Sequence, residues 1–528
     1  MNTKLQKYIY GMLSLLSLIG ACYFIILVLT PVLGDELMFR NYYWLATNSQ
    51  ELTLSSIPRM IDIVRTDENG RLANILMPYW SLGLPHAVGC AFFSAMLAAI
   101  IYGVAVLGTG LKRPKFAFVA LSWIAISFTL PWFSGMLPTA MQMNYTPASL
   151  LLLFVAWGFT KPEISKLETV AIGICALFAA MLHEGAAVAE CCGIGLYLIC
   201  KRFRLNGKQW IITTAVLIGT AVILSSPAIW SKFIYTKDIP YSYNNTLKLF
   251  ILTEIATIIA TVLLFVGLAI KHFRPKFTAL TKDGSFIFAA GIAISGFLIN
   301  YSTNFVYGRS TWFAEIFAVI IIIKELDIFF SKTSAKAITT VGIVSALLCS
   351  LFFSGVIYWQ FIYYKQNEEI EKLLAVSPTY TVFYDLEDRC PYYTLLYPEF
   401  RSWRIPFCYL FITPGETKPF SIVPLGLKDF MGTGATPTPG KAGAMQWNST
   451  TILPDRELWI GGSNGEKIIG HVANANADII DSNGIEFKKM PVTLLRFTAQ
   501  NGSKWIYISP IPRNIHHPFL RVDNVTID

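Results

Sequence analysis

An acidic triplet, Gly34-Asp35-Glu36, follows closely after the first long apolar segment of the chain. A carboxylate can take the proton from a sugar hydroxyl, so Asp35 and Glu36 are candidate general bases. The pair has a simpler alternative role, because carboxylates also stabilise the N-terminus of a following helix. Ionisable groups close to a membrane are costly, and we therefore expect at least one of the two to serve in chemistry.

Two arginines that each follow a glycine form a second group of candidates, Arg71 and Arg309. A planar guanidinium donates two parallel hydrogen bonds and suits the recognition of phosphate. The alternative is that both side chains only extend along the lipid to reach its headgroups. A phosphate site requires that the fold bring together two residues that are far apart in sequence.

Further polar and aromatic residues lie on the same predicted side of the membrane as these arginines. Asn144 and Tyr145 are expected in a loop there, and His183 and Glu184 at the end of a span. A buried carboxylate such as Glu184 or Glu190 requires a cationic partner or a functional role. His183 has the simpler interpretation of a buried histidine whose hydrogen bonds are satisfied, and Tyr145 that of an interfacial aromatic residue.

These residues must be positioned by membrane-spanning helices. The 528 residues are 54% hydrophobic and only 14% charged, and the mean hydropathy is +0.52, whereas soluble proteins carry about 25% charged residues. The net charge of +9 comes from short basic clusters between apolar segments and does not indicate nucleic-acid binding. We predict about eleven spans: 8–29, 86–110, 116–133, 145–160, 168–183, 185–200, 210–226, 248–270, 284–300, 311–323 and 337–359.

The charges of the connections alternate along the chain. Lys and Arg cluster in every second connection, and the positive-inside rule places these and the N-terminus in the cytoplasm. The first outer connection, 30–85, is long and contains amphipathic stretches at 37–50 and 54–65. We expect interfacial helices within 36–66 of a transmembrane domain that covers 1–359.

Residues 360–528 lack apolar spans and show short β-like segments separated by Asn-Gly turns. This pattern predicts a small extracytoplasmic β-rich domain after the all-α membrane region. Cys390 and Cys408 both fall in it, as a disulfide or as two free thiols. The spacing of the nine cysteines matches no zinc or iron–sulfur site.

The ordered motifs resemble the GT-C superfamily of integral-membrane glycosyltransferases, and within it bacterial proteins of the O-antigen glucosyltransferase type. The likeness covers roughly residues 1–330. Glu36 stands where an Asp is common in the family. The motifs that carry the resemblance are Gly34-Asp35-Glu36, Asn69-Gly70-Arg71, Trp132-Phe133-Ser134-Gly135 leading to Asn144-Tyr145, His183-Glu184 and Tyr307-Gly308-Arg309.

The resemblance implies inverting transfer of a sugar from a polyprenyl-phosphate donor to a glycan or glycolipid acceptor, on the extracytoplasmic face of the bacterial inner membrane. It implies Asp35 as base with Glu36 as neighbour or substitute, and Arg71 and Arg309 at the departing phosphate. Substrate-orienting roles fall to Asn144, Tyr145, His183, Glu184 and Tyr307. No cofactor is expected; a divalent metal at the two acids is the less favoured alternative. The rival interpretations are a transporter or flippase and a repeat-unit polymerase for surface polysaccharide.

Overall fold

The computed structural model describes most of the membrane region and the strands that follow it. The described residues are 3–30, 39, 43, 53–132, 136–161, 163–237, 250–302, 308–376, 381–385, 421–424, 443–446, 457–462, 467–480, 486–498, 504–509 and 521–527. They divide into two compact units, one ending at Gln360 and one beginning at Phe361.

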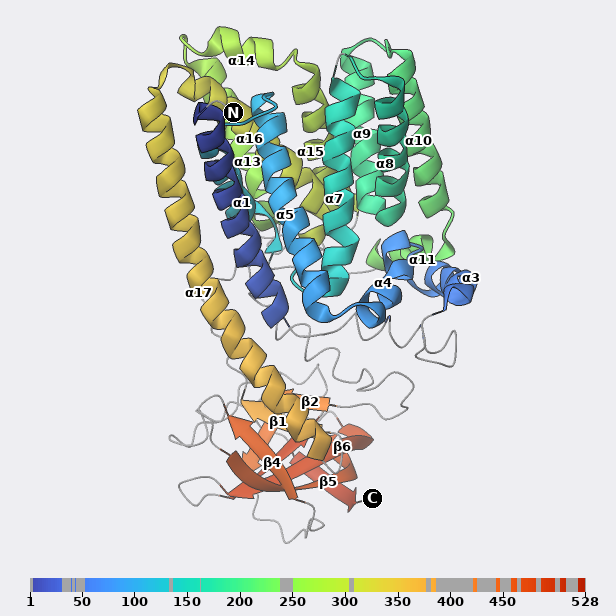
Figure 1. The fold of residues 1–528 in the computed structure, drawn as a ribbon. Helices are drawn as coiled ribbons and strands as arrows, with labels where there is room; N and C mark the ends of the chain where they lie inside the picture. The colour runs from blue at the N-terminus through green and yellow to red at the C-terminus, as the bar shows by residue number, and fades with distance from the viewer. Residues whose placement is uncertain are drawn as a thin grey trace. The chain divides into compact units, whose positions relative to one another are not determined.

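Long helices dominate the first unit and run in roughly the same direction, up or down (Figure 1). Among the described residues, five helices contain segments long and apolar enough to cross a membrane: Leu5–Leu29, His86–Thr109, Gly207–Leu224, Gly284–Tyr301 and Ala335–Lys365. The chain is therefore a helical multi-pass membrane protein. The long helices are α1 (Thr3–Leu29), α5 (His86–Thr109), α6 (Phe116–Thr129), α7 (Thr139–Thr160), α8 (Lys166–Leu182), α9 (Glu184–Cys200), α10 (Gly207–Leu224), α13 (Ile255–Ala269), α15 (Gly284–Ser302), α16 (Trp312–Phe329) and α17 (Ala335–Val376).

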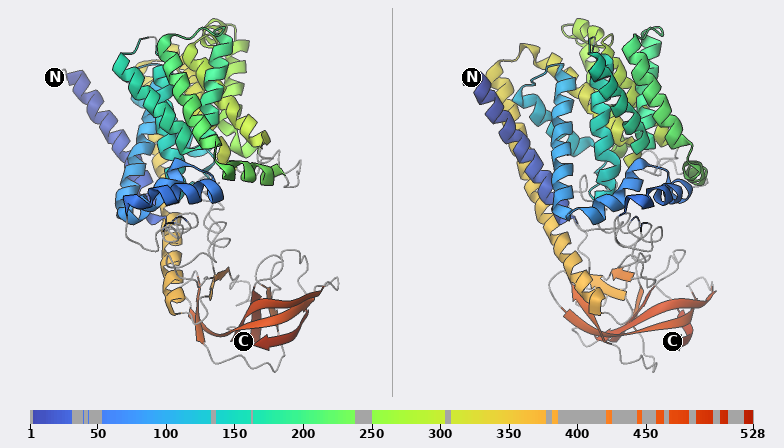
Figure 2. Two further views of the ribbon diagram at one scale, coloured as in Figure 1. Left: turned by 90° about the vertical axis from the view of Figure 1, so that its right-hand side faces the viewer. Right: turned by 45° about the vertical axis from the view of Figure 1, so that its right-hand side comes forward.

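Short helices lie across the ends of these long ones (Figures 1 and 2). At one end, which we call the α4 end, lie α3 (Ile57–Ile63), α4 (Leu72–Gly83) and α11 (Pro227–Lys237). The opposite end carries α14 (Arg274–Leu280) and the N-terminus. Residues 54–68 form a 3-10 turn, helix α3 and a π-helical turn in succession. Helix α4 was missed by the sequence analysis, because its apolar run contains Pro78.

The basic connections meet at the α14 end. Tyr8 donates a hydrogen bond to the carbonyl of Pro114 at 3.1 Å, which joins the N-terminal helix to the α5–α6 connection. Lys201 donates to the carbonyl of Lys282 at 3.1 Å, and Lys276 to Ser331 at 2.7 Å. The alternation of charge along the sequence therefore corresponds to two different ends of the helix bundle.

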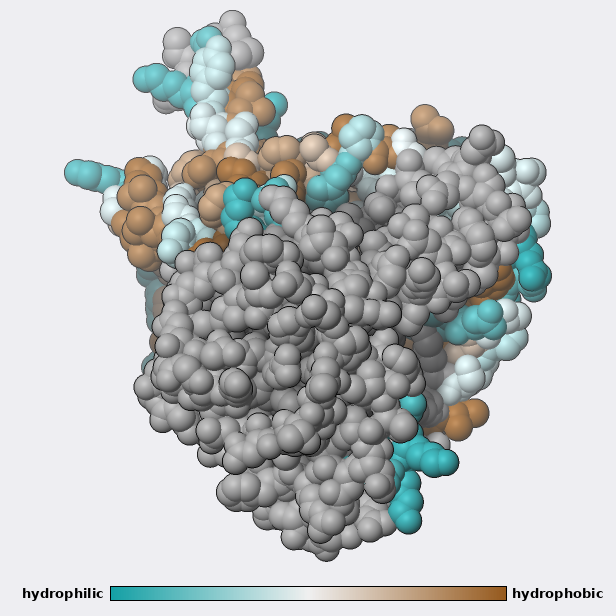
Figure 3. Space-filling model, turned by 90° about the horizontal axis from the view of Figure 1, so that it is seen from below, coloured by the Kyte–Doolittle hydropathy of each residue, from teal (hydrophilic) through white to brown (hydrophobic). Residues whose placement is uncertain are grey.

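Close helix packing depends on small residues, as is usual between membrane helices. A Cβ atom on Gly291 of α15 would lie 2.6 Å from the carbonyl oxygen of Cys192 and 2.8 Å from the Cα of Gly193 on α9. Larger residues here would force α9 and α15 apart. Elsewhere, large apolar side chains such as Leu167, Phe265 and Leu351 are mostly exposed, and Figure 3 shows hydrophobic residues at the surface of several described segments.

The second unit contains an eight-stranded sheet with the order β2-β1-β4-β5-β6-β7-β3, in which β8 pairs with β5. Strands β4 to β7 are antiparallel neighbours, whereas β1 runs parallel to β2 and β4. The strands are β1 (Thr381–Asp385), β2 (Ser421–Pro424), β3 (Gly443–Gln446), β4 (Glu457–Gly462), β5 (Lys467–Ile480), β6 (Glu486–Thr498), β7 (Lys504–Ser509) and β8 (Arg521–Ile527). Cys390 and Cys408 lie outside the described residues.

Candidate functional site

A tight turn before α4 presents Arg71 at the α4 end. The preceding helix closes with a π-helical turn, Val64–Glu68, and Gly70 adopts a left-handed φ of 69°. A Cβ atom on Gly70 would lie 2.5 Å from the Cβ of Ser226, so a side chain is excluded both by conformation and by space. π-helical turns are rare and occur often at functional sites.

This turn is fastened to the segment between α10 and α11. Arg65 donates to the hydroxyl of Ser225 at 2.7 Å and to the carbonyl of Val222 at 3.2 Å. In return the hydroxyl of Ser226 donates to the carbonyl of Arg65 at 2.7 Å. Residues about 160 positions later in the chain therefore hold the backbone that carries Arg71 in place.

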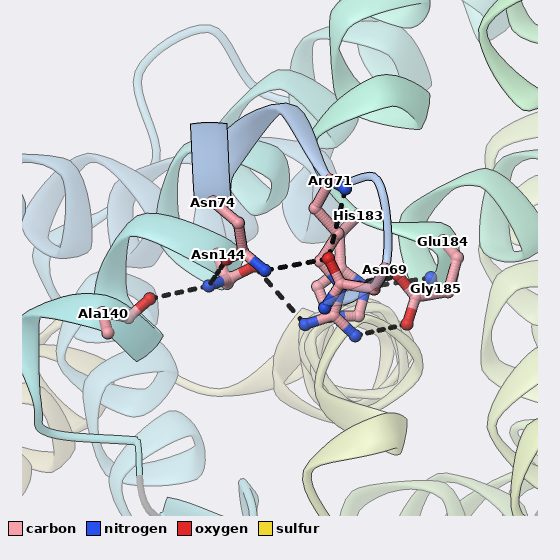
Figure 4. Close-up of polar contacts among 8 residues, drawn as sticks. All are labelled: Asn69, Arg71, Asn74, Ala140, Asn144, His183, Glu184 and Gly185. Carbon is pink, nitrogen blue, oxygen red and sulfur yellow. Dashed lines mark hydrogen bonds and ion pairs between the residues drawn. The ribbon is translucent and has the colours of Figure 1, made fainter. Parts of the chain in front are cut away.

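Three buried asparagines connect the turn to α7 (Figure 4). The side-chain oxygen of Asn69 accepts from the backbone of Arg71 at 3.2 Å and from Asn74 at 2.8 Å. The amide of Asn144 donates to Asn74 and to the carbonyl of Ala140, each at 2.8 Å. Because buried amides need partners, this chain of bonds fixes α4 against the first turns of α7.

The guanidinium of Arg71 is held by Glu184 (Figure 4). Its Nε donates to Oε2 at 2.6 Å, Nη2 donates to Oε1, and Nη1 reaches Oδ1 of Asn144 at 3.4 Å. Both partners of the ion pair are only partly exposed, Arg71 at 15% and Glu184 at 29%. The cationic partner expected for Glu184 is thus Arg71, and this arginine is anchored to protein rather than extended along lipid.

His183 occupies the one-residue break between α8 and α9. It is extended, with φ −156° and ψ 131°, and its Nδ1 accepts from the backbone N–H of Gly185 at 2.9 Å. The ring is 3% exposed and lies 4.5 Å from the ring of Tyr145 and 5.3 Å from that of Phe313, between centroids. The sharp reversal places the N-terminus of α9, with its partial positive charge, beside Arg71.

Arg309 acts on the same buried side chains as Arg71. It lies in a 3-10 turn, Gly308–Thr311, directly before α16. Its side chain interacts with the hydroxyl of buried Tyr145, and its charge, like that of Arg71, acts on His183. Two arginines that are distant in sequence therefore act on the same two side chains.

A buried acidic pair between α13 and α16 was missed by the sequence analysis. Glu315 on α16 accepts from the backbone of Ala256 at 2.6 Å and from both N–H and hydroxyl of Thr257 at 3.1 and 2.6 Å, which caps α13. Glu254 lies next to it and accepts from Asn300 at 2.9 Å. The signal was present, because any carboxylate inside a predicted span warrants an explanation.

One placement of the predicted site residues was wrong, and others lie outside the described residues. Asn144 and Tyr145 are buried in α7, which starts at Thr139, and not in a loop before a span that starts at 145. Pro138 initiates this helix, and hydrogen-bonded amides let its polar first turns be buried. Asp35, Glu36 and Tyr307 fall outside the described part of the chain. Within that part, no three His, Cys, Asp or Glu side chains are grouped to hold a metal.

The chain matches no protein-family model and no curated protein sequence. Its function must therefore be argued from the residues gathered at the α4 end.

Proposed function

We propose that this chain is a GT-C-type glycosyltransferase that moves a sugar from a polyprenyl-phosphate donor to a surface glycan or glycolipid. The observation that carries this proposal is the convergence of Arg71 and Arg309 on Tyr145 and His183 at one end of a membrane helix bundle. Two guanidinium groups at the membrane boundary suit the phosphate of a lipid-linked donor, whose chain can remain in the bilayer.

In the proposed reaction Asp35 removes the proton from an acceptor hydroxyl as its oxygen attacks the anomeric carbon. The bond from that carbon to the phosphate oxygen breaks, and its electron pair leaves with the polyprenyl phosphate, which inverts the anomeric configuration. Arg71 and Arg309 stabilise the charge that develops on the departing phosphate, where fixed cations are most effective. Glu36 is the neighbouring or substitute base, and a divalent metal at the two acids is the less favoured alternative.

Glu184 has a positioning role in this scheme. It grips two nitrogens of Arg71 and, with Asn144, holds the guanidinium in one orientation before any ligand arrives. A preset cation costs no reorganisation when charge develops. Because the carboxylate also offsets part of the positive charge, the pair can remain partly buried without a ligand.

We further propose that eleven helices cross a bacterial inner membrane and that the α4 end faces outward. The support is the collection of Lys-rich connections at the α14 end, which the positive-inside rule places in the cytoplasm. The strands that follow α17 then belong to an extracytoplasmic domain. This orientation brings the site to the face where surface glycans are completed.

A proton-coupled transporter or flippase is the second candidate. Glu190 on α9 is fully buried, and neither of its carboxyl oxygens has a hydrogen-bond partner among the described residues. Buried acids of this kind carry protons in transporters. A repeat-unit polymerase would share the donor chemistry, and it differs in extending a chain rather than adding one sugar.

The test of the proposed function is sugar transfer by the purified protein after Asp35→Asn and after Glu36→Gln. Loss of a general base lowers a rate by roughly 10²–10⁴-fold, and we expect that loss for Asp35→Asn. Full activity of Asp35→Asn with none in Glu36→Gln moves the base to Glu36. Full activity of both variants contradicts the mechanism, while proton-driven uptake without transfer supports the transporter.

A further inference from the structure

The hydrogen bonding of His183 fixes its protonation state. Nδ1 accepts from the backbone N–H of Gly185 at 2.9 Å, so this nitrogen carries no hydrogen. A neutral imidazole has one N–H, which then stands on Nε2. Burial of the ring opposes a second proton most strongly, and the positive charges of Arg71 and Arg309 add to this effect, whereas the charge of Glu184 acts against it. His183 is therefore a neutral side chain with a single donor of fixed identity.

That donor, the Nε2–H of His183, is buried and has no hydrogen-bond partner among the described residues. A buried donor without a partner costs about 1–3 kcal/mol, so it is rarely retained without a use. It lies in a ring packed against Tyr145 and Phe313, within the field of both arginines.

We propose that the Nε2–H of His183 donates a hydrogen bond to a phosphoryl oxygen of the ligand held by Arg71 and Arg309. The inference rests on the proposed function and makes it more specific. The two arginines supply charge, and the histidine supplies a neutral donor whose direction is set by the cap on Gly185. A neutral acceptor would gain less here, because a charged acceptor strengthens the bond most.

Two amide substitutions separate the binding role of His183 from its structural role. The Asn side chain ends near the position of Nδ1, so His183→Asn keeps an acceptor for Gly185 and loses the distal donor. The longer Gln side chain places its NH₂ near the position of Nε2, so His183→Gln keeps a distal donor and loses the cap. The two variants therefore fail in opposite respects.

The experiment measures binding of farnesyl phosphate to detergent-purified protein, with thermal stability recorded in parallel. We expect His183→Asn to bind roughly ten- to a hundredfold more weakly than wild type while it keeps its stability. We expect His183→Gln to bind within a few-fold of wild type although it unfolds at a lower temperature. Equal binding by wild type and His183→Asn overturns the inference and leaves the proposed function standing.

Two further arms identify the source of the phosphoryl group. Inorganic phosphate and vesicles of phosphatidylglycerol are tested as competitors of farnesyl phosphate. Weak competition by both is expected, because neither combines a phosphoryl group with a polyprenyl chain. Displacement by phosphatidylglycerol at equal concentration would overturn the inference in favour of a site for bulk lipid headgroups. Wild-type protein that binds no farnesyl phosphate would overturn this inference and the proposed function together.

Discussion

Replacement of Glu184 by Gln tests whether the Arg71 pair holds the α4 end together. Glu184 accepts two side-chain hydrogen bonds from Arg71, and Asn144 accepts another. In Glu184→Gln one carboxyl oxygen becomes an NH₂ group that faces a guanidinium N–H, and the remaining bond loses its charged acceptor. The substitution therefore removes one bond and weakens another without changing the size of the side chain.

The magnitude follows from the exposure of the pair. A hydrogen bond to a charged group contributes about 1.5–3 kcal/mol, and breaking a fully buried ion pair costs about 3–5 kcal/mol. Arg71 is 15% exposed and Glu184 is 29% exposed, so breaking this pair should cost less than breaking a fully buried one. We expect Glu184→Gln to lower the free energy of unfolding by about 2 kcal/mol.

The assay is unfolding of the detergent-purified protein by sodium dodecyl sulfate. Glu190→Gln is the matched control, since it makes the same change on the same helix where no partner is present among the described residues. We expect Glu190→Gln to be neutral or stabilising, because it removes a buried carboxyl. Equal effects of the two substitutions would refute the reasoning, as would a coupling to Arg71→Met of less than about 0.5 kcal/mol in a double-mutant cycle.

Three further predictions concern the scaffold. Gly70→Ala should lower the melting temperature more than Gly110→Ala. The two glycines have similar positive φ angles of 69° and 67°, but only a Cβ atom on Gly70 would clash with Ser226. Equal melting temperatures of the two variants would contradict this. Glu315→Gln should cost about 1–2 kcal/mol through the weakened cap on α13, and an unchanged unfolding curve would show that the cap contributes nothing. A cysteine placed at Ser463 should react with an impermeant thiol reagent in intact cells; reaction only after permeabilisation would reverse the proposed orientation.

The helical membrane character could be predicted from the sequence, because a long apolar segment in lipid must satisfy its backbone hydrogen bonds internally, as a helix does. Boundaries were harder wherever polar residues are buried with partners. The span expected at 145–160 begins at Thr139, since Asn144 is satisfied by Asn74 and by a carbonyl one turn back. Helix α4 was missed because Pro78 breaks its pattern, although hydrogen bonds of Asn74 to Asn69 and Asn144 hold the helix in place.

For the candidate site as well, some features could be predicted from the sequence and others could not. The need of Glu184 for a cation could be predicted from the cost of a buried carboxylate, yet nothing in the sequence named Arg71 as the partner. Single-sequence patterns report local periodicity and carry no information on which distant residues meet. For that reason the contact of Arg309 with Tyr145, and the cap that Glu315 provides to α13, emerge only from the fold.

Donor use by Arg309→Lys tests the central claim most directly. The measurement is transfer of labelled sugar from a polyprenyl-phosphate donor by purified wild-type and variant protein of equal stability, with Arg65→Lys as a control arginine on the scaffold side of the turn. Lys keeps the charge and the reach to lipid headgroups but lacks the planar fork. We expect donor use to be roughly ten- to a hundredfold weaker in Arg309→Lys. Near-normal sugar transfer by Arg309→Lys would contradict this expectation and would make Arg309 a membrane anchor.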